Sequence, residues 1–441
     1  MRKYLIICAL PFYILSDSSN AFIERYPDSN DLFKINIAVK DNIDIKGKVT
    51  SAGSLALYKN VANEDAFIIK KLIQNNFHIS GKTNLSEWAN FRSTKSISGW
   101  SSLGGQTKHP LNPLYNPCGS SSGSAVAVAS GLVNIAIGTE TNGSITCPAS
   151  VVGIVGMKPT VGLVSRSGII PISESQDSAG PMGSSVEIVA KTLQAIAGFD
   201  PNDTKTKLIP LNFDFNLMPS LDSKNLKGKR FGLLSSGFDN KYGKEFLKIL
   251  TIHINRLGAE LVLIDDERIY PSNESYFLLL YEFKKGLESY LQKSSEQKKT
   301  LSEIIVFNKL NADKVMPHFG QEIFLASEKA SMNSLKYHDA IKAIEQSTRQ
   351  TISLLDKYKL DAFIGLTRGP AWKIDYDGGD GAAMDKTLAF GNGGFSAISG
   401  LPHITIPYFK IESFPVGLSL IGRPWSDRDI LSFAFALEQS K

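Results

Sequence analysis

The stretch GTETNGSITCPAS, residues 138–150, places a serine where it could carry out nucleophilic chemistry. It follows an apolar run at residues 132–137 that predicts a buried strand, and it turns through a glycine corner toward a short helix. Backbone N–H groups at such a corner have no helical partners, and the helix dipole adds positive potential there. Ser144 could therefore attack a carbonyl carbon while nearby N–H groups bind the oxyanion, those of Thr141, Asn142, Gly143 and Ser144. Taken alone, the stretch is better explained by Ser144 capping the helix.

A nucleophilic serine requires a base, and two residues are candidates. Lys40 ends the apolar run INIAVK, and a lysine serves as a base only if burial lowers its pKa from about 10.4. Asp41 is next to it, but neighbouring side chains of a strand point to opposite faces, so the two need not touch. His403, in the segment GLPHITIP, is the other candidate.

The segment GSSSG, residues 119–123, carries further serines. It fits the G-x-S-x-G pattern of a nucleophile elbow, but that pattern requires a preceding strand, and the residues before it are rich in proline and asparagine. A phosphate-binding loop is excluded because no lysine follows the glycines. A flexible linker is disfavoured because the segment runs directly into a regular helix of small residues, SAVAVASGL.

The elements that must position these residues alternate between strand and helix, which predicts an α/β layered fold. Strands are predicted at residues 35–39, 77–84, 133–140, 230–236, 259–265 and 360–367. Helices are predicted at residues 65–76, 123–132, 147–156, 244–258 and 334–358. Residues 270–330 are interpreted as a helical excursion that borders the site.

The composition is that of a globular protein with a sizeable core. The 441 residues are 42% hydrophobic and 21% charged, and the net charge of +5 is too small to favour a nucleic-acid partner. The six histidines are scattered, so no metal site is predicted. Of the three cysteines, Cys118 and Cys147 are interpreted as buried packing residues rather than as a disulfide or a nucleophile.

The N-terminus has the layout of a secretory signal peptide. Arg2 and Lys3 precede an apolar run at residues 4–15, and a segment of small residues ends at Ala21. The apolar run is shorter than the roughly 20 residues that span a bilayer. We therefore expect a signal peptide over residues 1–21, a single domain over residues 22–441, a secreted or periplasmic product, and no stable membrane insertion after cleavage. If the segment is instead a buried helix, the protein is cytoplasmic.

Taken together, these segments resemble the amidase signature family, and within it the branch of bacterial peptide amidases. The resemblance runs from about residue 36 to residue 431, through the motifs AVKDNIDIKG, GKTNLSEWANFRS, PCGSSSGSAVAVASGL, GTETNGSITCPASVVGIVGMKPTVGLVSR and FPVGLSLIGRPWSDRDIL. It implies a large mixed β-sheet flanked by helices on both sides.

The resemblance also implies roles for individual residues. Ser144 matches the nucleophile, Ser120 the serine that bridges it to the base, and Lys40 the base of a Ser-Ser-Lys triad. Ser121 matches a supporting serine, the peptide bond before Ser120 matches a cis bond, and the backbone of residues 141–144 matches the oxyanion hole. No metal or cofactor is implied.

Two departures bear on function. Asn142 stands where many members have glycine, and Thr146 stands where many have an arginine that handles acidic or glutamine-like groups. We therefore predict an amidase that hydrolyses a carboxylic or peptide C-terminal amide to acid and ammonia through an acyl-enzyme. Its partners are expected to be a small amide or peptide-amide substrate and at most a second copy of itself.

Two alternatives remain: a catalytically inactive binding relative, and the A-type component of a glutamyl-tRNA amidotransferase, which works with a partner chain. The pocket walls are expected from residues 84–91, 280–330 and 367–381.

Overall fold

The computed structural model describes residues 18–234, 238–330, 333–384 and 393–440, so most of the expected signal peptide lies outside the described residues. One eleven-stranded sheet dominates the described chain, in the order β1-β3-β2-β6-β8-β7-β12-β13-β11-β9-β10. Its strands are β1 (Phe22–Arg25), β2 (Ile35–Lys40), β3 (Phe77–Thr83), β6 (Ile135–Glu140), β7 (Val155–Lys158), β8 (Ser178–Gly183), β9 (Arg230–Leu234), β10 (Glu260–Ile264), β11 (Ala362–Leu366), β12 (His403–Ile411) and β13 (Phe414–Ile421).

The sheet is mixed, as the resemblance implied. β2 pairs in parallel with β3 and β6, and β9 pairs in parallel with β10 and β11, whereas β6, β8, β7, β12, β13 and β11 run antiparallel to their neighbours in that series. Two short strands, β4 (Trp100–Ser101) and β5 (Gly105–Gln106), form a separate ribbon. The mixed sheet thus places the ends of β2 and β6 side by side.

Helices cover both faces of this sheet because its strands are apolar on both faces. In β2, Ile37 and Val39 belong to a core shared with one set of helices, whereas Ala38 belongs to a core shared with another. The first set is α1 (Phe67–Gln74), α4 (Val186–Ile196), α5 (Lys241–Arg256) and α13 (Asp427–Gln439); the second is α2 (Ser122–Ala129) and α3 (Thr146–Val152). The predicted fold class is confirmed.

The small residues of α2 allow close approach to the backbone around it. A Cβ atom at Gly123 would lie 2.3 Å from the carbonyl oxygen of Ala21 and 2.4 Å from that of Asn84. The carbonyl oxygens of Ser19 and Ala21 accept hydrogen bonds from Lys108 and Asn84, respectively, at 2.8 Å. Residues 19–21 are therefore part of the fold.

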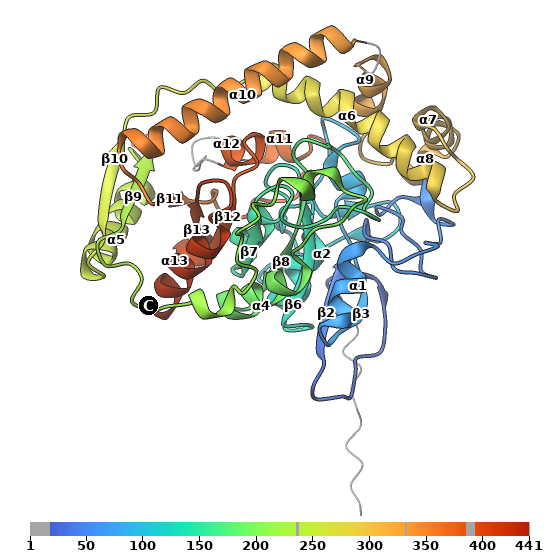
Figure 1. The fold of residues 1–441 in the computed structure, drawn as a ribbon. Helices are drawn as coiled ribbons and strands as arrows, with labels where there is room; N and C mark the ends of the chain where they lie inside the picture. Colours follow the sequence, from blue (N-terminus) through green and yellow to red (C-terminus); the bar gives the residue numbers. More distant parts are fainter. Residues whose placement is uncertain (1–17, 235–237, 331–332, 385–392, 441) are drawn as a thin grey trace, which may run out of the picture.

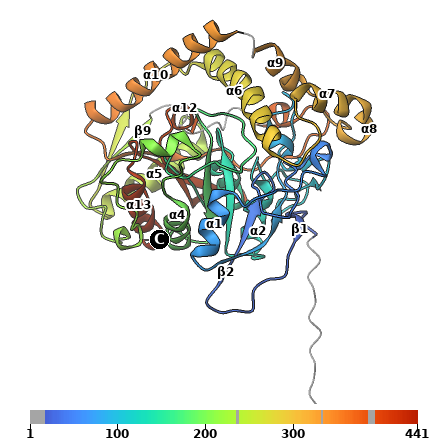
Figure 2. The ribbon, with the colours of Figure 1, turned by 45° about the vertical axis from the view of Figure 1, so that its right-hand side comes forward.

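A further helical layer arches over the sheet (Figures 1 and 2). It contains α6 (Ser272–Lys293), α7 (Leu301–Leu310), α8 (Ala312–Val315), α9 (Glu322–Ala330) and α10 (Ser334–Lys357), and it has its own apolar cluster around Leu278, Phe283 and Phe324. The predicted helical excursion is thus confirmed. The remaining helices are α11 (Asp380–Ala383), α12 (Gly393–Ile398) and the 3-10 turns η1 (Leu55–Leu57), η2 (Glu87–Asn90), η3 (Thr204–Leu208) and η4 (Met218–Ser220). None of the helices in the described residues is long and apolar enough to cross a membrane.

Candidate active site

The corner that carries Ser144 leaves a row of backbone donors free. β6 ends at Glu140 and α3 begins at Thr146, so residues 141–145 form the turn. The Glu140 carboxylate accepts hydrogen bonds from the N–H groups of Ile145 and Thr146, at 2.7 and 2.9 Å. Within the described residues, no acceptor is hydrogen-bonded to the N–H groups of residues 141–144. Glu140, and not Ser144, therefore caps the N-terminus of α3. The N–H groups of residues 141–144, predicted as oxyanion donors, remain available to a ligand.

Lys40 ends β2 and is fully buried beside Ser120. Its Nζ lies 2.7 Å from Ser120 Oγ, 2.8 Å from Thr139 Oγ1 and 3.1 Å from the Thr139 carbonyl oxygen. A neutral amine has two N–H donors and one lone pair. It can therefore donate to both Thr139 oxygens and present its lone pair to the Ser120 hydroxyl.

The surroundings of Lys40 favour its neutral form. Burial lowers its pKa to about 7, against the opposing fields of Asp177 and Glu140, which raise it. Asp41 does not pair with Lys40 and so does not stabilise its charged form. The Asp41 carboxylate instead forms an ion pair with Lys82 at 3.0 Å and accepts a hydrogen bond from Ser51. The predicted orientation of Asp41 is confirmed.

The segment that carries Ser120 has the backbone that the resemblance implied. The Gly119–Ser120 peptide bond is cis, and no strand enters the segment. The Ser121 N–H donates to the Ser144 carbonyl oxygen at 3.1 Å, which joins the two serine loops. The Ser121 hydroxyl also donates to the Thr139 carbonyl oxygen at 3.1 Å, the same oxygen that Lys40 Nζ contacts.

Ser144 lies at the front of this arrangement and Ser120 behind it. Ser120 is fully buried, whereas Ser144 lines a cavity of about 280 Å³. Among the described residues, no hydrogen bond joins the two hydroxyls. The structure therefore brings Lys40 and Ser120 into direct contact and places Ser144 on the adjoining turn. A proton relay through all three residues would also require a hydrogen bond between the hydroxyls of Ser120 and Ser144.

His403 is removed from this group of residues. It lies in β12, and its Nε2 is 2.6 Å from Ser419 Oγ. Burial, together with the charge of Lys158, lowers the pKa of His403 to about 3. Of the two candidate bases, only Lys40 contacts one of the predicted site serines.

Cys118 and Cys147 form a disulfide, with an S–S distance of 2.00 Å. The expectation that they are separate packing residues is wrong. The loop that precedes Ser120 packs against α3, and the Cα atoms come within 6.1 Å although 29 residues separate them in the sequence. Both cysteines line the cavity in front of Ser144, and the bond joins the loop before Ser120 to α3, which follows the Ser144 turn.

Two of the three predicted wall segments, residues 84–91 and 367–381, reach this cavity, whereas no residue of the predicted stretch 280–330 lines it. Residues 84–91 contribute Ala89, Asn90 and Phe91, α6 contributes Leu279, and residues 367–381 contribute Arg368, Trp372 and Asp380. Leu279 precedes the predicted stretch by one residue. Sequence reasoning named these segments but not the charged pair Arg368 and Asp380.

Thr141 lines both this cavity and a second one of about 730 Å³. Its hydroxyl donates to Asp177 at 2.5 Å, and the same carboxylate accepts the N–H groups of Ile172 and Ser173, at 2.7 and 2.9 Å. Asp177 therefore links the Ser144 turn to the loop at residues 166–177, which lines the larger cavity and whose Ile172 lines both.

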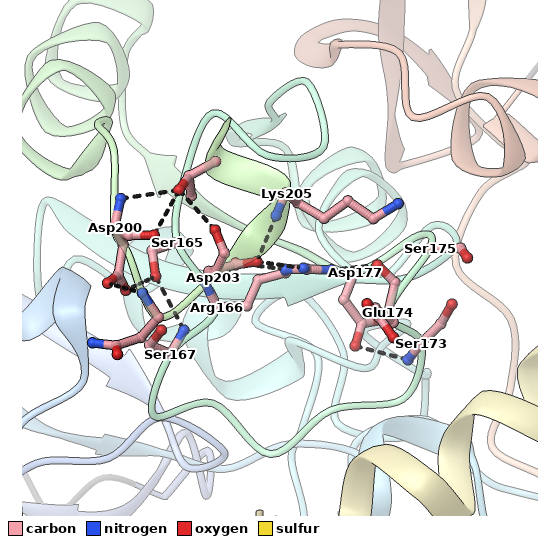
Figure 3. A network of polar contacts seen from close by, with 12 residues as sticks. Ser165, Arg166, Ser167, Ser173, Glu174, Ser175, Asp177, Asp200, Asp203 and Lys205 are labelled. Atoms are coloured by element: carbon pink, nitrogen blue, oxygen red, sulfur yellow. Dashed lines mark hydrogen bonds and ion pairs between the residues drawn. The ribbon is translucent and has the colours of Figure 1, made fainter. Parts of the chain in front are cut away.

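That loop is held at its other end by a polar network (Figure 3). Arg166 donates two hydrogen bonds to the Asp203 carboxylate, at 2.8 and 2.6 Å, and a third to the Glu174 carbonyl oxygen at 2.6 Å. Ser165 donates to Asp200 at 2.5 Å. Because the loop is held at both ends, Asp177 is fixed in position, and its hydrogen bond fixes Thr141 in turn.

The chain is similar to known proteins over nearly its whole length. The sequence model of the family described as Amidase matches residues 17–431. A probable amidase of Arabidopsis thaliana is 35% identical over 93% of this chain and 77% of its own length, and the A-type component of the glutamyl-tRNA(Gln) amidotransferase of Symbiobacterium thermophilum is 33% identical over 91% and 82%. The crystal structure of the native peptide amidase from Stenotrophomonas maltophilia is 39% identical and superimposes with a TM-score of 0.88, over 96% of this chain and 89% of that one.

These similarities, together with the mixed sheet and the turn that carries Ser144, place the chain in the amidase-signature class of proteins. Because the family model spans almost the entire sequence, the chain belongs to the Amidase family. It is an enzyme that hydrolyses amide bonds.

Proposed function

We propose that the chain hydrolyses a small carboxylic amide or a peptide C-terminal amide to the acid and ammonia, with Ser144 as nucleophile, Ser120 as bridge and Lys40 as base. The observation that carries this proposal is the contact between a buried, low-pKa lysine and Ser120, next to a serine turn with four free N–H groups. The first provides a proton acceptor at neutral pH, and the second provides a site for the oxyanion.

The proposed reaction proceeds through an acyl-enzyme. Neutral Lys40 takes the Ser120 proton as Ser120 takes that of Ser144, and Ser144 Oγ bonds to the amide carbon. The carbonyl oxygen becomes an oxyanion held by the N–H groups of residues 141–144. The relay then returns a proton to the amide nitrogen, the C–N bond breaks and ammonia leaves. Water attacks the ester by the same route, which releases the acid and restores the three residues.

The choice of a peptide-type amide is supported by overall similarity. The peptide amidase neighbours cover 96% of this chain at TM-scores of 0.87 to 0.88, whereas the corresponding amidotransferase component from Thermotoga maritima aligns at 0.75 with 26% identity. A glutamine-fed amidotransferase component is the second candidate, favoured by curated relatives of that name.

We also propose that the protein is exported. The predicted signal peptide supports export, and so does the Cys118–Cys147 bond, because disulfides persist mainly in oxidising compartments. N-terminal sequencing of the protein from its native host should find that the apolar run at residues 4–15 has been removed. Residues 19–21 hydrogen-bond within the fold, which favours a cut before Ser19 over one after Ala21. An intact Met1 on cytosolic protein would contradict export.

Ammonia release from a panel of peptide amides, acyl amides and free glutamine tests the proposed reaction. We expect turnover of the amides by the isolated chain, and mass spectrometry should locate a fluorophosphonate probe on Ser144. Turnover of glutamine alone would favour the amidotransferase alternative, and no turnover with no labelling of Ser144 would favour an inactive relative.

A further inference from the structure

The cavity in front of Ser144 is lined by the guanidinium group of Arg368, which has no oxygen acceptor among the described residues. Arg368 follows β11 by two residues, and the Thr367 N–H before it donates to the Gly417 carbonyl oxygen at 2.8 Å, which fixes the backbone against β13. The Arg368 guanidinium carbon lies 4.9 Å from the centre of the Trp372 ring, and Nη2 contacts Met384 Sδ. Trp372 and Met384 line the same cavity as Ser144, so the charged group forms part of its wall.

No oxygen of the described residues accepts a hydrogen bond from Arg368. Asp380, the nearby carboxylate, already accepts the Ser98 N–H at 2.9 Å, the Asn116 amide at 3.0 Å and the Trp372 indole N–H at 3.3 Å. A guanidinium has five N–H donors in a planar fork, and donors left unfilled in a partly buried site cost free energy. A bound oxygen ligand would remove that cost.

The cavity also offers one unfilled acceptor. Asn90 donates its amide to Ser98 Oγ at 2.9 Å, but its buried Oδ1 has no hydrogen-bond partner in the part of the chain that the structure describes. Asn90 lines the cavity on a segment in which Trp88, Ala89 and Asn90 all have positive φ angles, a conformation that such residues adopt at sites where the surrounding fold imposes it. A ligand that satisfies both groups must carry an anionic or carbonyl oxygen and an N–H.

We propose that Arg368 binds a carboxylate on the acyl part of the substrate, so that the preferred substrates are amides with an anionic acyl group, such as peptide amides that end in an acidic residue. The planar fork matches a carboxylate in bidentate geometry, which favours that group over a single carbonyl oxygen. The peptide N–H of such a substrate is the donor that Asn90 Oδ1 lacks. The inference deepens the proposed amidase function and depends on it.

Three substrates with the same backbone and with side chains of negative, zero and positive charge test the proposal: N-acetyl-glutamate α-amide, its γ-methyl ester, and N-acetyl-lysine α-amide. We expect kcat/KM from ammonia release to be highest for the glutamate amide. Arg368→Met should lower that value by about 10- to 100-fold, mainly through KM, and should lower the value for the methyl ester much less. Arg368→Lys should retain part of the preference, and Arg368→Glu should shift it toward the lysine amide.

Arg349→Met, at an exposed position on α10, is the matched control and should change none of the three values. Turnover of the methyl ester reports that each variant is folded and that the hydrolytic machinery works. Equal losses on the charged and neutral substrates would overturn the assignment of Arg368, as would a wild-type enzyme that prefers the ester. Absence of turnover with all three substrates, together with no probe labelling of Ser144, would instead contradict the proposed function itself.

Discussion

At Lys40, burial and nearby carboxylates act on the pKa in opposite directions. Burial is the larger effect and brings the pKa to about 7, while Asp177 and Glu140 hold it above the value that burial alone would give. A lysine in this range can exchange a proton with a serine hydroxyl near neutral pH, which an exposed lysine cannot do.

This balance predicts the pH dependence of the enzyme. The base must be neutral, so kcat/KM should rise with pH through about 7 and level off above it. Lys40→Arg should lose about 10³-fold or more in kcat, because a guanidinium keeps its proton at every working pH. The measurement is a pH–rate profile for both proteins. Near-normal turnover by the arginine variant would mean that position 40 supplies only a fixed positive charge.

At Ser144 the prediction concerns the nucleophile. Ser144→Ala should lower kcat by on the order of 10⁴-fold with the fold intact by circular dichroism, because the alanine cannot form the acyl-enzyme. His403→Ala is the paired variant, and its kcat should stay within a few-fold of wild type, since His403 contacts Ser419 rather than the serine relay. Retained activity in Ser144→Ala would redirect the search for the nucleophile to Ser121.

At the scale of elements, α3 is held by a carboxylate from the strand before it. Glu140 ends β6 and accepts the N–H groups of Ile145 and Thr146, so the strand end and the helix start are joined across the turn that carries Ser144. A carboxylate at a helix N-terminus is favoured by the free donors and by the helix dipole.

Glu140→Gln tests this arrangement in two ways. The free energy of unfolding should fall by about 1–2 kcal/mol in urea titrations, because a neutral amide accepts more weakly than a carboxylate. The acidic limb of the pH–rate profile should move to lower pH, because Glu140 raises the pKa of Lys40 and its neutralisation removes that effect. Glu245→Gln, at an exposed position on α5, should change neither value. A limb that stays in place would contradict the proposed coupling between Glu140 and Lys40.

At the scale of the whole molecule, the Cys118–Cys147 bond closes a loop of the chain that contains both Ser120 and Ser144. A bond between residues 29 apart lowers the entropy of the unfolded chain and so stabilises the fold by about 3.6 kcal/mol. The double variant Cys118→Ala/Cys147→Ala should lose about that much stability in urea. A reductant should bring the wild type close to the variant and leave the variant unchanged. If the wild type and the double variant are equally stable without reductant, the bond has no structural role.

The sequence by itself determined the elements that have a strong local pattern. The alternation of apolar residues predicts β2 and β6, the small-residue run predicts α2, and the motifs point to Lys40, Ser120 and Ser144. The predictions of these strands and this helix succeed because strand and helix periodicity are properties of neighbours in the chain.

Only the tertiary structure decided which side chains meet across the fold. Lys40 and Ser120 are 80 residues apart, and their contact depends on β2 and β6 being neighbours in the sheet, with α2 packed on them. The same holds for the Cys118–Cys147 bond, which spacing could not reveal, and for the position of Arg368 on the cavity wall. Contacts of this kind are set by strand order and loop packing, and these depend on the burial of the whole core rather than on any local stretch of residues.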